Sequence, residues 1–365
     1  MRVLVTGVNG FIGRNLVAHL GRLKGIEVCS IARESSTADL VAAAGTADFV
    51  FHLAGANRPV EVREFDEVNV GLTRLVCAAL LKEKRKVTIV YTSSIQTEFD
   101  SPYGKSKLAA EGILQQYSCD AGALVHLYRL PNVFGKWSRP NYNSAVATFC
   151  YNIARDLPIE VRDPAAKLHL VYIDDVIAEF MSKLNGMVSA AVVSPVYDTT
   201  VGDVATLIRA FRASRINLIS ERVGAGLTRA LYATYVSFQP IEQFAYSLTK
   251  HSDARGDFVE MLKTKDSGQF SYFTAHPGMT RGSHFHHSKT EKFLVIQGKA
   301  RFRFRNIATG ESLELTVSGE KPQIVESIPG WAHDISNIGD RELIVMLWAN
   351  EMFDHSRPDT FTQRV

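Results

Sequence analysis

Short apolar runs alternate with amphipathic stretches along the chain up to about residue 245. Residues 2–6 form an apolar run rich in β-branched side chains, and similar runs fit strands over 27–32, 48–53, 87–92 and 124–130. Helical patterns lie between these runs, the first from Asn15 to Leu23. Strands that alternate with helices predict an α/β architecture with a doubly wound parallel sheet.

The pattern changes near residue 245. From His251 onward, short segments of alternating apolar and polar residues, such as 300–305, are separated by glycine and polar turns. This pattern is typical of an all-β domain. The length of 365 residues is also about twice that of a usual domain of ~100 to 200 residues. We therefore predict two domains, over residues 1–245 and 246–365.

Composition excludes several classes of protein. Lys and Arg number 41 against 38 Asp and Glu, and neither half of the chain carries a basic arm for nucleic acid. No apolar run approaches the ~20 residues of a membrane helix, and the N-terminus lacks the basic and apolar segments of a signal peptide. We expect a cytoplasmic protein that binds neither nucleic acid nor membranes.

Three glycines follow the first predicted strand and precede the first predicted helix: Gly7, Gly10 and Gly13. Glycines at such a turn let the backbone approach a pyrophosphate, which the helix N-terminus then binds. Arg33 ends the second strand, where an NAD-selective enzyme usually has an acidic residue, and Arg14 follows the third glycine. These features predict a Rossmann-type domain that binds NADPH.

Ser94 follows a predicted strand, and Tyr103 and Lys107 follow the helix start Ser101-Pro102. Residues four apart share one face of a helix. A lysine ammonium near a phenol lowers the pKa of the phenol, and a nearby hydroxyl can polarise a carbonyl group. We therefore predict Ser94, Tyr103 and Lys107 as catalytic residues, with Lys107 also contacting the cofactor.

With these residues the sequence resembles the extended short-chain dehydrogenase/reductase family, many of whose members act on nucleotide sugars. The resemblance implies that Ser94, Tyr103 and Lys107 are the catalytic triad. Dehydratases of this family carry an acidic pair beside the catalytic hydroxyl, whereas this chain has Ile95-Gln96 there. Because carbonyl reduction does not need that pair, we favour a reductase.

The second half contains the spacing Gly278-x5-His284-x-His286-x4-Glu291-x6-Gly298, and His333 follows some forty residues later. Residues two apart on a strand share a face, so His284 and His286 can converge on one ion. Three imidazoles and a carboxylate suit Zn²⁺, Fe²⁺, Mn²⁺ or Ni²⁺, and we expect Zn²⁺. The spacing resembles a cupin barrel, although Pro329-Gly330 stands where cupins usually have Pro-x-Gly.

Across nearly its whole length the chain resembles bifunctional capsular-polysaccharide and O-antigen enzymes that make precursors of UDP-N-acetyl-L-fucosamine. The resemblance rests on residues 52–59, 135–144, 284–295 and 350–354. It implies a homodimer whose cupin domain epimerises C3 of a UDP-4-keto-6-deoxy-HexNAc. The first domain would then reduce C4 with NADPH to UDP-2-acetamido-2,6-dideoxy-L-talose.

Substrate-binding residues are expected in segment 129–135, which resembles the dehydrogenase/reductase family, in segment 135–144 and at the entry to the second domain: Asn132, Lys136, Asn141, Asn143 and Arg255. Two other functions also fit the residues. The second domain could be an oxygen-using cupin, since Fe²⁺ suits the same ligands, or a catalytically silent module for binding or dimerisation.

Overall fold

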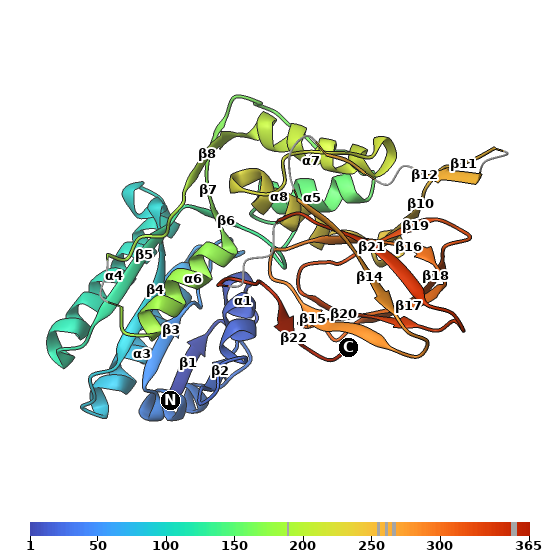
Figure 1. Cartoon of the computed structure of the whole chain (residues 1–365). Helices are drawn as coiled ribbons and strands as arrows, with labels where there is room; N and C mark the ends of the chain where they lie inside the picture. The colour runs from blue at the N-terminus through green and yellow to red at the C-terminus, as the bar shows by residue number, and fades with distance from the viewer. Residues whose placement is uncertain (188–189, 254–255, 260–261, 265–267, 352–355) are drawn as a thin grey trace. The chain divides into compact units, whose positions relative to one another are not determined.

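The structure, a computed structural model, describes residues 1–187, 190–253, 256–259, 262–264, 268–351 and 356–365 (Figure 1). The chain forms two compact units. The first unit comprises residues 1–133 and 169–198, and the second comprises 134–168 and 199–365.

A five-stranded parallel sheet in the order β2-β1-β3-β4-β5 forms the centre of the first unit. Its strands are β1 (Arg2–Thr6), β2 (Glu27–Ile31), β3 (Phe49–His52), β4 (Thr88–Ser94) and β5 (Val125–Leu130). The structure extends β4 two residues beyond the predicted strand, because Ser93 and Ser94 still pair with β5. This extension places Ser94 at the carboxyl end of a buried strand.

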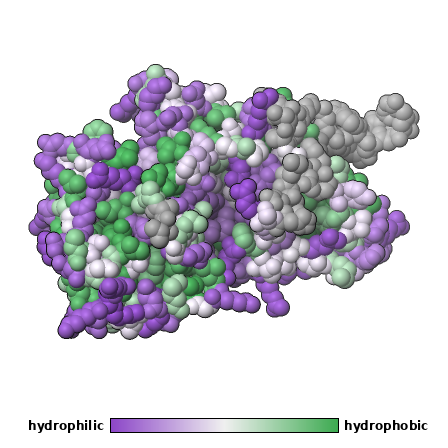
Figure 2. Space-filling model, turned by 60° about the vertical axis from the view of Figure 1, so that its left-hand side comes forward, coloured by the Kyte–Doolittle hydropathy of each residue, from purple (hydrophilic) through white to green (hydrophobic). Residues whose placement is uncertain are grey.

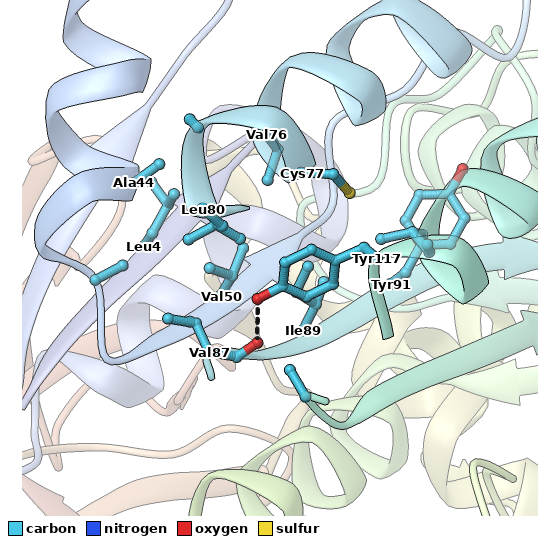
Figure 3. Packing of buried hydrophobic residues seen from close by; sticks show 14 of the residues in the cluster. Leu4, Ala44, Val50, Val76, Cys77, Leu80, Val87, Ile89, Tyr91 and Tyr117 are labelled. Carbon is cyan, nitrogen blue, oxygen red and sulfur yellow. Dashed lines mark hydrogen bonds between the residues drawn. The ribbon is translucent and has the colours of Figure 1, made fainter. Parts of the chain in front are cut away.

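Helices cover both faces of this sheet. They are α1 (Phe11–Leu20), α2 (Thr37–Thr46), the π-helix η1 (Phe65–Gly71), α3 (Leu72–Lys82), the 3-10 helix η2 (Ile95–Glu98), α4 (Pro102–Ala121) and α6 (Ile173–Leu184). On one face, apolar side chains from the sheet and from α2, α3 and α4 form a continuous core (Figure 3). Tyr117 of α4 lies within this core, and its hydroxyl donates to the Val87 carbonyl oxygen at 2.9 Å. On the other face, Phe180 of α6 packs on Phe51 with ring centroids 5.9 Å apart.

The second unit combines helices with the C-terminal strands. The helices are α5 (Ala145–Ala154), α7 (Val201–Asn217), α8 (Gly226–Ser237) and the 3-10 helix η3 (Ile241–Gln243). Three short strands, β6 (Asn132–Phe134), β7 (Lys167–Tyr172) and β8 (Tyr197–Thr200), form a separate sheet, most of whose residues belong to the first unit.

The C-terminal strands form two five-stranded antiparallel sheets, which we call the β-domain. One sheet has the order β10-β19-β16-β21-β14, with β10 (Ala245–Ser247), β19 (Gln323–Glu326), β16 (Glu291–Gln297), β21 (Leu343–Ala349) and β14 (Gln269–Ala275). The other has the order β18-β17-β20-β15-β22, with β18 (Ser312–Ser318), β17 (Lys299–Asn306), β20 (Trp331–Asn337), β15 (Thr280–Phe285) and β22 (Phe361–Thr362). The remaining pairs are β11 (Lys250–Asp253) with β12 (Gly256–Val259), and β9 (Ile219–Ser220) with β13 (Lys263–Thr264).

The predicted fold class is confirmed, since the N-terminal strands form a parallel sheet and the C-terminal strands form antiparallel ones. The compact units, however, do not follow the predicted ranges 1–245 and 246–365. Helices α7 and α8 belong with the β-domain because Arg215 pairs with Glu326 and Arg229 pairs with Glu351. A change in sequence pattern marks where the strands begin and does not show which helices pack on them.

Large hydrophobic side chains are also present at the surface. Phe99, Leu108 and Leu124 are among the exposed ones in the first unit. Hydrophobic and hydrophilic residues are interspersed over the face of the molecule in Figure 2. Scattered exposed apolar residues of this kind are normal for a folded protein and do not by themselves indicate a binding surface.

Candidate active site and metal centre

The predicted glycine turn joins β1 to α1 and packs tightly against the chain after β3. Gly7 has a φ of +73°, and a Cβ at this residue would lie 2.7 Å from the backbone nitrogen of Ala54. A Cβ on Gly13 would lie 2.2 Å from the carbonyl oxygen of Gly7. Gly10 is the N-cap of α1, whose first turn presents backbone N–H groups and the positive end of the helix dipole. The turn therefore fits the pyrophosphate of a dinucleotide.

The two arginines predicted to bind a 2′-phosphate are both exposed. The Arg33 side chain is 88% exposed, and its Nη2 lies 3.7 Å from an oxygen of Glu64. Arg14 lies in the first turn of α1 with its side chain toward solvent. Both guanidinium groups are accessible to an anionic ligand, and the preference for NADPH stays a prediction.

A buried hydrogen-bond network beside the glycine turn links Thr6, His52 and Thr73. The hydroxyl oxygen of Thr6 accepts from the backbone nitrogens of Leu53 and Ala54, each at 3.1 Å. The hydroxyl proton of Thr6 is then directed to Nδ1 of His52 at 2.8 Å, so Nε2 of His52 donates to Thr73 at 2.9 Å. Burial, with the nearby charge of Lys107, lowers the pKa of His52 to about 3, so this imidazole is neutral.

Ser94 and Tyr103 meet where β4 ends and α4 begins. The Ser101 side chain caps α4 by accepting from the backbone nitrogen of Gly104 at 3.0 Å. A Cβ on Gly104 would lie 2.2 Å from the carbonyl oxygen of Gln96, so only glycine permits this close approach of α4 to η2. The Tyr103 phenol interacts with the Ser94 side chain, which lowers the pKa of Tyr103, but burial has the larger and opposite effect, so this pKa lies above its usual value.

Lys107 lies one helical turn after Tyr103 and is almost completely buried. Its ammonium donates to the Thr92 carbonyl oxygen at 2.8 Å and to the Tyr91 hydroxyl at 3.2 Å. A Cβ on Gly55 would lie 3.1 Å from this nitrogen. Burial lowers the pKa of Lys107 to about 8, because a low-dielectric environment disfavours the charged form. The three predicted catalytic residues therefore gather at one edge of the sheet.

The four predicted metal ligands converge between the two sheets of the β-domain. His284 lies on β15, His333 on β20, and Glu291 begins β16, while His286 follows β15 directly. The ligand atoms of all four lie within 4.8 Å of one another. The imidazole centroids of His284 and His333 are 4.8 Å apart, because the two residues are register partners. Glu291, His286 and His333 are buried.

The protonation pattern of this cluster fits a divalent cation. Nδ1 of His286 lies 2.6 Å from the backbone carbonyl oxygen of Asp359, which can only accept, so Nδ1 must carry a proton. Nε2 of His286 faces a carboxylate oxygen of Glu291 at 2.9 Å. A divalent cation could bind both of these atoms, and the N and O donors suit Zn²⁺.

The electrostatics of the cluster agree with this arrangement. Burial acts to raise the pKa of Glu291, but the charges and hydrogen bonds of His286 and His333 outweigh it and hold the pKa well below its usual range. Burial, followed by the two neighbouring imidazoles, lowers the pKa of His284 to about 3. The cluster therefore presents an ionised carboxylate and a neutral imidazole, which are the forms that bind metal.

Residues 3–191, just over half of the chain, match the NAD dependent epimerase/dehydratase family. The chain belongs to the NAD dependent epimerase/dehydratase family. Residues 251–361 match a second family, described as a polysaccharide biosynthesis C-terminal domain. The two matches fall on the glycine turn with the predicted triad and on the β-domain with the metal ligands.

Relatives from two bacteria span the whole chain. It is 57% identical, over 99% of its length and 98% of the relative, to the UDP-2-acetamido-2,6-beta-L-arabino-hexul-4-ose reductase of Pseudomonas aeruginosa. The crystal structure of the capsular polysaccharide assembling protein CapF from Staphylococcus aureus aligns over 100% of both chains with a TM-score of 0.70 and 40% identity. These comparisons confirm the family predicted from the sequence.

A solved UDP-glucuronic acid 4-epimerase from Bacillus cereus, in complex with NAD, aligns over 65% of this chain and 96% of its own. Its identity is 18% and its TM-score 0.55, so this likeness concerns the fold alone. As a member of the NAD dependent epimerase/dehydratase family, the chain is expected to use a nicotinamide cofactor.

The residues predicted to bind substrate lie in different environments. Asn132 is exposed in the first unit, and Asn141 and Asn143 are exposed in the second. Lys136 is only 1% exposed, and its ammonium lies 5.5 Å from the centre of the Trp137 ring. The prediction for Arg255 falls outside the residues that the structure describes.

Sequence reasoning missed two residues beside the triad. Glu111, one helical turn after Lys107, accepts from Ser93 at 2.5 Å and forms two hydrogen bonds with Arg129 at 2.7 and 3.0 Å. Asn69, in the π-helix η1, accepts from the Ala56 nitrogen at 2.8 Å. The helical spacing of Lys107 and Glu111 was a signal for the first residue, whereas no local pattern marks Asn69.

Helices long and apolar enough to cross a membrane are absent from the part of the chain that the structure describes.

Proposed function

We propose that this chain converts a UDP-4-keto-6-deoxy-HexNAc to UDP-2-acetamido-2,6-dideoxy-L-talose in two steps. The β-domain inverts C3, and the first unit then reduces the C4 carbonyl with NADPH. The observation that carries the reductase assignment is that the Tyr103 phenol interacts with the Ser94 side chain while Lys107 is buried one helical turn further along α4. The name of the Pseudomonas aeruginosa relative, a reductase of a UDP-linked 4-ulose, supports the same substrate class.

Each residue of the triad has a distinct role in the reduction. Nicotinamide supplies the hydride to C4. Ser94 donates a hydrogen bond to the C4 oxygen, and the Tyr103 phenol transfers its proton to that oxygen as negative charge develops. The ammonium of Lys107 stabilises the resulting phenolate. The glycine turn holds the pyrophosphate of the cofactor, and Arg14 and Arg33 are proposed to bind its 2′-phosphate.

The residues around the triad favour reduction over elimination of water. Elimination needs an acid and a base beside the catalytic hydroxyl. Here Ile95 and Gln96 follow Ser94, and both lie in η2. The buried carboxylate near this point, Glu111, is already bound to Ser93 and Arg129. Reduction needs none of these groups, since it requires only the proton from Tyr103 and the hydride.

The β-domain is proposed to act on C3 as a cupin. A ketone at C4 acidifies the proton on C3, so C3 inverts when that proton is removed and returned on the opposite face. A Zn²⁺ ion held by His284, His286, Glu291 and His333 would act as a Lewis acid on an oxygen of the substrate. Those four residues come from both sheets of the β-domain, and their nitrogen and oxygen donor atoms lie close together.

Binding of the substrate is proposed to use Asn132, Lys136, Asn141, Asn143 and Arg255. Lys136, Asn141 and Asn143 lie in the segment 135–144, where the sequence resembles capsule and O-antigen enzymes, and Asn132 lies in a segment that resembles the dehydrogenase/reductase family. Amide groups pair well with sugar hydroxyls and uracil, and guanidinium groups pair with diphosphate oxygens.

The Tyr103→Phe variant tests the reductase assignment. Loss of the phenolic proton should lower kcat for NADPH oxidation with the 4-keto UDP-sugar by roughly 10²- to 10⁴-fold. Exchange of the C3 proton with deuterium should continue, because the β-domain is unchanged. Tyr151→Phe is the matched control, since Tyr151 lies on α5 against Phe238 and Arg155. A Tyr103→Phe enzyme that keeps the wild-type rate of NADPH oxidation would refute the assignment.

A further inference from the structure

The C-terminal segment of the chain lies beside the predicted metal ligands His284 and His286. We call residues 358–362 the strap. In the strap, Thr362 is the register partner of His284, and Phe361 is the partner of Phe285. The strap therefore pairs, through β22, with the strand that carries the first metal ligand.

The carboxylate of Asp359 holds the turn between His286 and Glu291. Its Oδ1 accepts from the backbone nitrogen of His287 at 2.9 Å, and its Oδ2 accepts from those of Ser288 and Lys289 at 2.9 and 2.7 Å. The hydroxyl of Ser288 adds a fourth hydrogen bond to Oδ2 at 3.1 Å. One carboxylate thus fixes three successive peptide groups that join two predicted metal ligands.

The backbone of the same residue fixes the His286 ring. The Asp359 carbonyl oxygen accepts from Nδ1 of His286 at 2.6 Å. This contact sets both the tautomer and the rotation of the imidazole, so Nε2 points toward Glu291. Asp359 has a φ of +34°, a backbone conformation uncommon for residues with a side chain, and its side-chain and backbone contacts together stabilise it.

Further contacts hold the strap in place. The ammonium of Lys289 donates to the hydroxyl of Thr360 at 2.7 Å. Arg229 of α8 donates to the hydroxyl of Ser288, the same group that donates to Asp359, and forms an ion pair with Glu351 at 3.0 Å. The arrangement around His286 is therefore connected to a helix of the second unit.

We propose that Asp359 is a positioning residue for the metal centre, which holds His286 in its ligating tautomer and fixes the turn from His286 to Glu291. This inference rests on the proposed metal site. Asp359 would not be a ligand of the ion, because its carboxylate faces the backbone and its carbonyl faces Nδ1 of His286. Outer groups that orient metal-binding histidines in this way raise metal affinity.

Competition with a chelator measures this role. Full-length protein is stripped of metal and titrated with Zn²⁺ in the presence of a chromophoric chelator. We expect the Zn²⁺ dissociation constant to rise by about 10- to 100-fold in Asp359→Ala. Asp359→Asn keeps the size of the side chain and loses one acceptor oxygen, so a smaller rise is expected, and this variant carries the test if Asp359→Ala does not fold.

Two other variants serve as controls, one expected to keep the Zn²⁺ affinity and one expected to lose it. Asp340→Ala removes an exposed carboxylate from the turn after β20 and should leave the affinity unchanged. His284→Ala removes a ligand and should abolish stoichiometric binding. The d–d absorption spectrum of the Co²⁺-loaded protein should change in both Asp359 variants and stay constant in Asp340→Ala, because it reports the geometry of the ligands.

The outcomes separate the two proposals. If the wild-type chain binds no Zn²⁺, the proposed metal site is wrong and the inference falls with it. If the wild type binds Zn²⁺ and the Asp359 variants keep its affinity and Co²⁺ spectrum, the metal site stands and the positioning role is wrong. A loss of thermal stability that is equal in metal-free and metal-loaded Asp359→Ala would also overturn the role, since it shows a purely structural contact.

Discussion

Burial determines the charge of two basic groups in the first unit. His52 and Lys107 both lie in the core of the first unit, and burial lowers the pKa of each. His52, with a pKa of about 3, is neutral in the folded protein. Lys107, with a pKa of about 8, is still charged at neutral pH and loses its proton under mildly alkaline conditions. Lys107 is therefore the group whose titration can change the reaction near physiological pH.

The reduction should consequently slow above about pH 8, where Lys107 becomes neutral and no longer stabilises the Tyr103 phenolate. The predicted loss of activity is on the alkaline side because burial lowers the pKa of Lys107, and lysine is charged below its pKa and neutral above it. The measurement is the pH profile of kcat/KM for NADPH oxidation. In Lys107→Arg the guanidinium stays charged, so its alkaline decline should move to higher pH even though the rate is lower.

Two results would contradict this role for Lys107. One is a wild-type profile that stays constant well above pH 8. The other is a Lys107→Arg profile that declines at the same pH as the wild type.

Candidate site residues could be predicted from the sequence where the members of one motif lie only a few residues apart. The four-residue spacing of Tyr103 and Lys107 and the spacing of His284, His286 and Glu291 each place side chains on one helix face or one strand. Asp359 gave no such signal, since its partners His286 to Lys289 lie about seventy residues away. Its role depends on a strand pairing that local sequence patterns do not contain.

At the scale of elements, the turn from β1 to α1 depends on glycine at particular places. A Cβ on Gly13 would lie 2.2 Å from the Gly7 carbonyl oxygen and 2.9 Å from the Gly7 carbonyl carbon, so the backbone itself would have to move. Gly112 contrasts with this, because nothing lies within 4 Å of a Cβ there and the residue is within α4. The same substitution should therefore have opposite effects at the two positions.

Gly13→Ala should weaken NADPH binding by about tenfold or more, equivalent to ~1.4 kcal/mol, because α1 is displaced from the pyrophosphate. Gly112→Ala should leave binding unchanged and stabilise the fold by up to about 1 kcal/mol through its helix propensity. Isothermal titration of NADPH and thermal unfolding of both variants measure the two effects. Equal NADPH affinity in wild type and Gly13→Ala would show that the turn does not hold the cofactor.

The sequence also predicted all five strands of the parallel sheet in the first unit, because buried strands appear in a sequence as apolar runs of a few residues. It did not predict the π-helix η1, whose bonding pattern has no distinct periodicity in the sequence. Nor did it predict that α7 and α8 pack with the β-domain. Lys292 of β16, Glu326 of β19 and Arg215 of α7 form a buried charged cluster there, and no spacing links them in the sequence.

At the scale of the whole molecule, the proposed function combines two reactions that a 4-keto sugar nucleotide can undergo in succession. The first unit holds the predicted triad and the glycine turn, and the β-domain holds the four predicted metal ligands. The carbonyl at C4 is needed to acidify C3, so inversion must precede the reduction that removes this carbonyl. The order of the two steps is therefore set by the chemistry of the substrate.

Proton NMR of the reaction in D₂O tests this central claim most directly. Wild-type protein is incubated with the 4-keto UDP-sugar, with and without NADPH. Without NADPH, deuterium should replace the proton at C3 while the C4 carbonyl remains. With NADPH, the product should be the C4-reduced L-talose derivative with deuterium at C3. A C4-reduced product that keeps its original C3 proton and configuration would contradict the account.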